Sequence, residues 1–141
     1  MRQIKYVADA ENIYVKLLAS AEKLAAGATD YLSIFFYDVV DGSGDGYYGW
    51  WKNAAGNNEC DNERTGVISG TDLTLHVNGV PAEVVKEVSG DDVLWTITIS
   101  RSSHVNLSAS EVNFAVMTYC GWDPNGALPD KYDNMLKVVL P

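Results

Sequence analysis

Basic residues are scarce in this chain of 141 residues, which carries 10 Lys and Arg against 19 Asp and Glu. The formal net charge of −9 argues against nucleic acid as a partner, because phosphate binding needs a basic face. An anionic membrane surface is disfavoured for the same reason. No apolar run approaches the roughly 20 residues of a membrane-spanning helix, so we expect no membrane insertion.

Cysteine is also rare. Cys60 and Cys120 stand too far apart in sequence to form a CxxC metal or redox motif, so they form either one disulfide or two buried thiols. The N-terminus lacks the basic-then-apolar pattern of a signal peptide. We nevertheless expect a secreted or cell-surface protein whose export signal has been removed.

Recognisable catalytic motifs are missing. The sequence has no GxSxG, no HExxH and no phosphate-cradling glycine loop. His76 and His104 are isolated from any metal or triad spacing, and Asp and Glu are too numerous to single out a glycosidase pair. We therefore expect a protein that is not an enzyme.

Short alternating segments, by contrast, fill the chain. A hydrophobic content of 47% is enough for the core of a single domain over residues 1–141. Only Ser20 to Ala28 favours helix, stopped by Gly27. The pattern predicts an all-β fold, an antiparallel β-sandwich of jelly-roll type with about eight to nine strands and minimal helix. The strands are expected at Ile4–Ala8, Asn12–Leu18, Tyr31–Val40, Gly66–Ser69, Asp72–Asn78, Val80–Val88, Val93–Arg101, Val112–Tyr119 and Met135–Leu140.

The turns between these strands are of two kinds. Asn78-Gly79 predicts a tight hairpin that joins two neighbours in a meander. Two long polar segments, Asn53–Thr65 and Gly121–Asp133, predict surface loops, and long loops in a small domain are often functional.

An acidic turn follows the Tyr31 strand. Asp38, Asp41, Ser43 and Asp45 place oxygen ligands at close intervals among glycines, a set that suits calcium. The pattern departs from an EF-hand, because Lys52 stands where the bidentate Glu would be and no helices flank the turn. The alternatives are a structural calcium site and a plain solvated turn.

Aromatic residues gather in the loops. Tyr47, Tyr48, Trp50 and Trp51 follow the acidic turn, and Trp122 lies in the second long segment. Aromatic rings stack on the C–H faces of sugars, while amides, carboxylates and guanidinium groups bind the hydroxyls. Neighbours on an extended chain face opposite ways, so the pattern leaves open which of Trp50 and Trp51 faces a ligand. Trp95, between apolar strand residues, is expected in the core.

Several short motifs resemble the family 9 carbohydrate-binding modules and the related DOMON-like sandwiches. They are ADAENIYV at residues 8–15, Phe36–Asp38 before a glycine turn, WTITI at residues 95–99, and a late loop with Trp122, Pro124 and Pro129. The resemblance implies a jelly-roll-like sandwich, structural calcium, and a slot in which two tryptophans clamp a sugar. By that analogy one jaw is Trp50 or Trp51 and the other is Trp122, with Arg64 and Asn125 beside them.

Three functions follow, in order of preference. The first is a non-catalytic, monomeric carbohydrate-binding module that binds xylan, β-glucan or a cellulose-like glycan and is excised from a chain with a catalytic domain. The second is a structural or adhesive cell-surface sandwich whose aromatic loops contact protein. The third, implied by the haem-binding members of the superfamily, uses Met117 and Lys52 as axial ligands.

Overall fold

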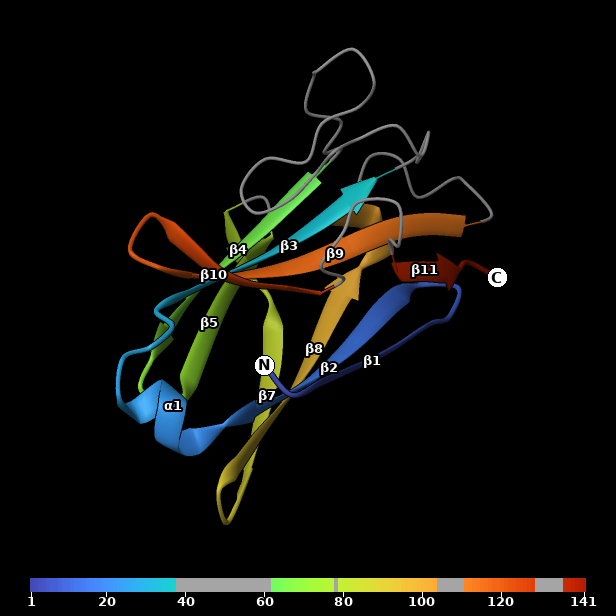
Figure 1. Ribbon diagram of the computed structural model, residues 1–141. Coiled ribbons are helices and arrows are strands. Elements are labelled where there is room, and N and C mark those ends of the chain that lie inside the picture. The colour runs from blue at the N-terminus through green and yellow to red at the C-terminus, as the bar shows by residue number, and fades with distance from the viewer. Residues whose placement is uncertain (38–61, 78, 104–110, 129–135) are drawn as a thin grey trace.

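The chain forms two stacked antiparallel β-sheets in a computed structural model that describes residues 1–37, 62–77, 79–103, 111–128 and 136–141 (Figure 1). Sheet A has the strand order β1-β2-β8-β7, and sheet B has the order β10-β9-β3-β4-β5-β6, with β11 also paired to β9. The strands are β1 (Gln3–Ala8), β2 (Asn12–Ser20), β3 (Tyr31–Tyr37), β4 (Asn62–Ser69), β5 (Asp72–Val77), β6 (Val80–Pro81), β7 (Glu83–Ser89), β8 (Asp92–Ser100), β9 (Glu111–Cys120), β10 (Asp123–Leu128) and β11 (Leu136–Val139).

One core fills the space between the sheets. Sheet A contributes alternate residues of β2 and β8, including Ile13, Leu17 and the fully buried Trp95, as its two-residue period requires. Sheet B contributes Ile34 and Phe114, among others, to the same cluster. The structure therefore confirms the predicted all-β sandwich and the core position of Trp95.

Helix is confined to two short pieces in the described residues, α1 (Ala21–Ala25) and a 3-10 turn at Arg101–Ser103. The side chain of Ser20 caps α1 by accepting a hydrogen bond from the backbone N–H of Lys23. Gly27, with a φ of 69°, turns the chain after the helix. The described residues contain no helix long and apolar enough to cross a membrane.

The predicted meander from β5 onward is wrong in one step. Val77 does pair with Val80 and Gly79 has a φ of 78°, as the expected hairpin requires, while Asn78 lies outside the described residues. The returning strand, however, is only Val80–Pro81, followed by one further backbone hydrogen bond from Ala82 to the carbonyl of Leu75. The chain then changes sheets, and β7 pairs with β8 instead.

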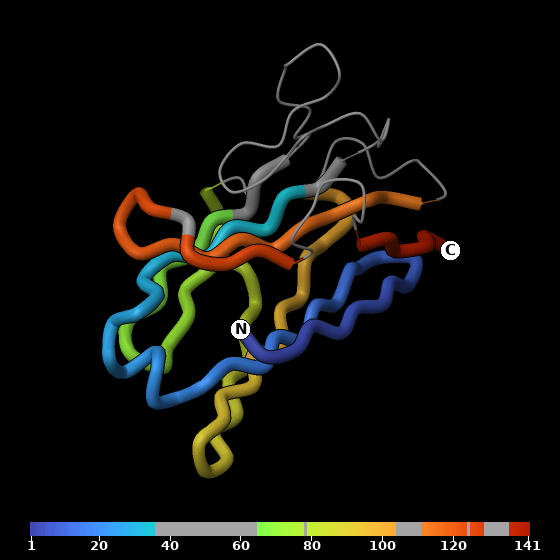
Figure 2. The backbone as a smooth tube through the Cα atoms, viewed as in Figure 1, coloured from blue at the N-terminus to red at the C-terminus, as the bar shows by residue number. Residues whose placement is uncertain are grey.

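Both predicted long loops are shorter than expected. Asn62 to Thr65, placed in a loop by their polarity, are the first half of β4 and pair with β3. Residues 123–128, placed in the second loop, form β10 and pair antiparallel with β9 through a β-bulge between Pro124 and Gly126. Trp122 therefore lies in the two-residue turn between β9 and β10. The return of the chain from β9 to β10 can be followed in the smooth backbone trace (Figure 2).

Candidate functional site

Trp122 is the most exposed large apolar residue in the described part of the chain. Its side chain is 98% exposed, although tryptophan is usually well buried in folded proteins. It occupies the Gly121–Trp122 turn that joins β9 to β10, where Gly121 has a φ of 59°. A glycine there permits the tight turn that sends Trp122 into solvent.

Hydrogen bonds fix this turn from the segment that follows α1. Both carboxylate oxygens of Asp30 accept from the backbone N–H of Gly121, at 2.9 and 3.1 Å. The backbone of Asp30 is itself held, since its N–H donates to Tyr119 and its carbonyl accepts from Ile68. The backbone next to Trp122 is therefore held at Gly121 by the side chain of Asp30, and at Tyr119 by its backbone N–H.

Asn125 holds the other side of the turn. Its Nδ2 donates to the carbonyl of Ala28 and, at 3.4 Å, to the hydroxyl of Thr29. Its Oδ1 accepts from the hydroxyl of Thr118 at 2.9 Å. Both amide hydrogens already have protein partners, so Asn125 braces β10, and this leaves it little capacity to bind the sugar hydroxyls that the sequence assigned to it.

Close packing between Gly126 and Thr118 also holds β10 against β9. A Cβ added at Gly126 would meet the hydroxyl oxygen of Thr118 at 2.7 Å, so the β-bulge needs a glycine here.

An apolar row lies on the outer face of sheet B beside the turn. Tyr31 pairs with Tyr119 on one side and with Val67 on the other, so the three side chains share one face. Tyr31 is 39% exposed and Val67 is 45% exposed. The row and Trp122 together offer a surface for flat, weakly polar ligands.

The predicted clamp is only partly covered by the described residues. Tyr47, Tyr48, Trp50 and Trp51 lie outside them, as does the side chain of Arg64, whose backbone pairs with Ile34 in the middle of sheet B. Tyr37 and Asn62, which bound the segment with these aromatics, lie at the opposite end of β3 from the Tyr31–Tyr119 pair and the turn after it. Within the described residues, Trp122 faces no second tryptophan.

The predicted calcium ligands Asp38, Asp41, Ser43 and Asp45 also lie outside the described residues, as does Lys52 of the haem alternative. Met117, its proposed partner, is 1% exposed and accepts a hydrogen bond from the hydroxyl of Tyr119. No group of three or more His, Cys, Asp or Glu suited to a metal ion occurs in the part of the chain that the structure describes.

The predicted disulfide partner of Cys120, Cys60, lies outside the described residues, so the disulfide stays a prediction. The thiol of Cys120 is exposed, not buried, and donates weakly to the carbonyl of Gly27.

Comparison with known proteins gives matches of fold only. No protein-family model matches the chain, and no curated protein does. Two similar solved structures are of a carbohydrate-binding module of family 9 from Caldicellulosiruptor kristjanssonii, in complex with cellotriose and with glucose. Each is 11% identical to this chain with a TM-score of 0.47, and the matches cover 97% and 98% of this chain and 73% and 75% of those.

These two structures belong to the family that the short sequence motifs resemble. At so low an identity and TM-score, the likeness transfers neither a ligand nor a site residue to this chain. The DOMON-like part of the resemblance stays a prediction.

Sequence reasoning found Trp122 and Asn125 but missed Asp30. Asp30 precedes a strand and carries no motif, so only the strand register reveals that it reaches the turn 91 residues later.

Proposed function

We propose that this protein is a non-catalytic carbohydrate-binding module that holds a glycan against the Trp122 turn. The observation that carries the proposal is the 98% exposure of Trp122 on a turn fixed by Asp30 and Asn125. An exposed indole offers a flat apolar surface to a ligand, and a backbone that is already held loses little conformational freedom on binding.

The chemistry of a sugar suits this surface. The C–H face of a pyranose ring stacks on an indole, while its hydroxyls stay in water or bind polar neighbours. Asp123, exposed beside Trp122, offers a carboxylate for such a hydroxyl. We expect modest affinity, because an open surface recovers little of the cost of desolvating hydroxyl groups.

The expected ligands are neutral plant-type glycans, namely xylan, β-glucan or a cellulose-like chain. We propose further that the module is monomeric, is secreted or at the cell surface, and keeps a catalytic domain of its parent chain near substrate. Affinity electrophoresis in gels that contain each soluble polysaccharide tests the binding. Retardation by at least one glycan is expected, and unretarded migration in all of them contradicts the proposal.

The rival function is protein contact by a structural or adhesive sandwich, since exposed aromatics also mark interfaces. Protein contact is the favoured function if two results are found together. No glycan retards the protein, and Trp122 lies in an interface between associating molecules. Sedimentation of the protein at several concentrations separates the two, because a glycan-binding monomer shows no concentration dependence.

We also propose that calcium stiffens the acidic turn at residues 38–46. Carboxylate and hydroxyl oxygens in this number suit a hard cation, and an ion bound only by the folded chain raises its stability. The melting temperature is expected to rise in calcium and to fall in chelator. An identical midpoint in both would return the segment to a solvated turn.

A further inference from the structure

A crevice of about 560 Å³ opens between the two sheets on the inner side of β10, away from the exposed face of the Trp122 turn. Leu24 and Val116, both nearly fully buried, belong to its lining and to the core. A volume of this order accommodates one small ligand such as a monosaccharide. The polar lining comes from Arg2, Ser20, Glu22, Lys23, Thr29, Thr118 and Asn125.

Positive charge collects at this crevice in a protein that is acidic as a whole. Two of the ten Lys and Arg residues, Arg2 and Lys23, belong to its lining, whereas Glu22 is the one carboxylate there. Arg2 donates from Nη1 to a carboxylate oxygen of Asp92. Among the described residues Lys23 has no ion-pair partner.

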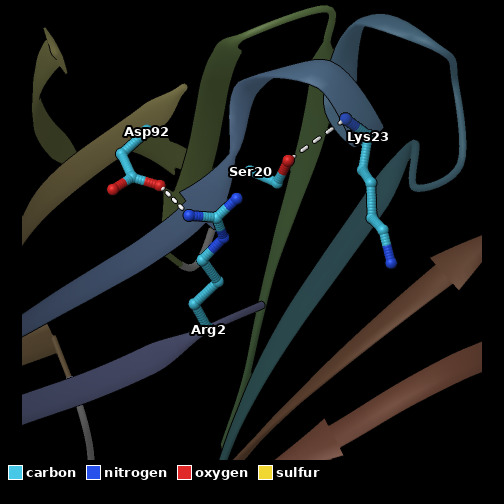
Figure 3. Close-up of polar contacts among 4 residues, drawn as sticks. All are labelled: Arg2, Ser20, Lys23 and Asp92. Carbon is cyan, nitrogen blue, oxygen red and sulfur yellow. Dashed lines mark hydrogen bonds and ion pairs between the residues drawn. The ribbon is translucent and has the colours of Figure 1, made fainter. Parts of the chain in front are cut away.

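The direction of Lys23 is visible in the close-up. Its side chain extends away from the Arg2–Asp92 pair, while its backbone N–H is used by the cap on Ser20 (Figure 3). The ammonium group is therefore available to a ligand in the crevice without disturbing the helix.

Hydroxyl groups stand next to the cations. Ser20 accepts from the backbone of Lys23, and Thr29 accepts from Asn125, so each hydroxyl keeps its own hydrogen to donate. The crevice therefore has the ammonium group of Lys23, which suits a carboxylate, and two hydroxyl donors, Ser20 and Thr29, which suit sugar hydroxyls.

We propose that this crevice is a second binding site, which takes a hexuronate, a sugar that carries a carboxylate. The carboxylate binds Lys23 and the ring hydroxyls bind Ser20 and Thr29, over the apolar floor of Leu24 and Val116. The site is separate from the neutral-glycan surface at Trp122 and stands whether or not that surface binds sugar.

The test is titration of the ¹⁵N-labelled protein with glucuronate, glucuronamide, glucose and inorganic phosphate, followed by amide chemical shifts and calorimetry. Glucuronate is expected to shift amides of residues 20–29 and 116–128 and to bind at least about tenfold more tightly than glucuronamide, which lacks the charge. Its affinity should fall as salt rises.

Three variants sharpen the test. Lys23→Gln keeps the backbone cap and should weaken glucuronate about tenfold, whereas Glu22→Gln should tighten it. Lys86→Gln is the matched control, because Lys86 pairs with Asp72 outside the crevice, and it should leave the affinity unchanged. Trp122→Ala should also leave glucuronate binding unchanged, which separates this site from the proposed function.

Several outcomes would overturn the assignment. They are an absence of glucuronate binding, equal binding of glucuronate and glucuronamide, and shifts confined to other residues. Phosphate that binds as tightly as glucuronate would reduce the crevice to a general anion site and remove the sugar from the account.

Discussion

Asp30 matters because its carboxylate holds the backbone N–H of Gly121 and so sets the direction of the next residue, Trp122. Replacing Asp30 with Ala leaves that N–H without its partner and should lower the free energy of unfolding by about 1–2 kcal/mol. Asp30→Asn keeps an oxygen acceptor and should cost clearly less. Urea unfolding measures both.

The comparison of Asp30→Ala with the wild type is decisive. If the two are equally stable, the carboxylate is not what fixes the turn, and the preorganisation of Trp122 loses its basis.

Asp9 lies in a charged turn that belongs neither to the Trp122 turn nor to the crevice. The backbone N–H groups of Glu11 and Asn12, and then the hydroxyl of Tyr14, lower the pKa of the Asp9 carboxyl below its ordinary value of 3.8. A carboxyl whose pKa is lower in the folded state stabilises the fold above its unfolded pKa. That contribution is lost as the pH falls through the folded pKa.

Asp9→Ala should therefore melt below the wild type at neutral pH, with a difference that shrinks as the pH falls below about 4. Thermal melts from pH 7 to pH 2.5 measure it, with the exposed β7 variant Glu83→Gln as control. A difference that is constant over the whole range would show that the Asp9 hydrogen bonds do not depend on its charge.

At the scale of elements, the end of β9 leaves the thiol of Cys120 exposed, where it donates weakly to the carbonyl of Gly27. Cys60 lies outside the residues that the structure describes, so the disulfide between the two stays a prediction. Alkylation of the unfolded, unreduced protein followed by mass spectrometry tests it. A disulfide leaves no thiol to label, whereas two added labels would show that both thiols are free.

Elements with a clean two-residue period could be predicted from sequence, and the others could not. Leu73, Leu75 and Val77 in β5 alternate with polar residues and are buried, as that period requires, and Trp95 in β8 is buried as expected. By contrast, β10 has the sequence DPNGAL, which is typical of a loop. It is a strand because β9 pairs with it and Asn125 ties it to residues 28 and 29, contacts between distant parts of the chain.

The difference between local sequence pattern and contacts of distant segments also decides which parts of the candidate site could be predicted. An isolated tryptophan among polar residues indicated a surface role for Trp122, because composition alone makes a core position unfavourable there. The crevice was not predicted, because its lining comes from four separate segments that only the sandwich brings together. Asn125 was assigned to a ligand, and the structure shows its amide bound to Ala28, Thr29 and Thr118 instead.

At the scale of the whole molecule, two sheets over one core form a rigid support with two distinct surfaces at one end. The turn at Trp122 is apolar, exposed and fixed, whereas the crevice behind β10 is hollow and carries Arg2 and Lys23. Different ligand chemistries suit the two, a neutral glycan at the first and an acidic sugar at the second.

Glycan binding through Trp122 is tested by the retardation of Trp122→Ala in affinity gels, run beside the wild type. The substitution removes a side chain that is 98% exposed, so the fold should keep its melting temperature. We expect wild-type protein to be retarded by a neutral glycan and the variant to migrate unretarded. A variant retarded as strongly as the wild type would contradict this expectation.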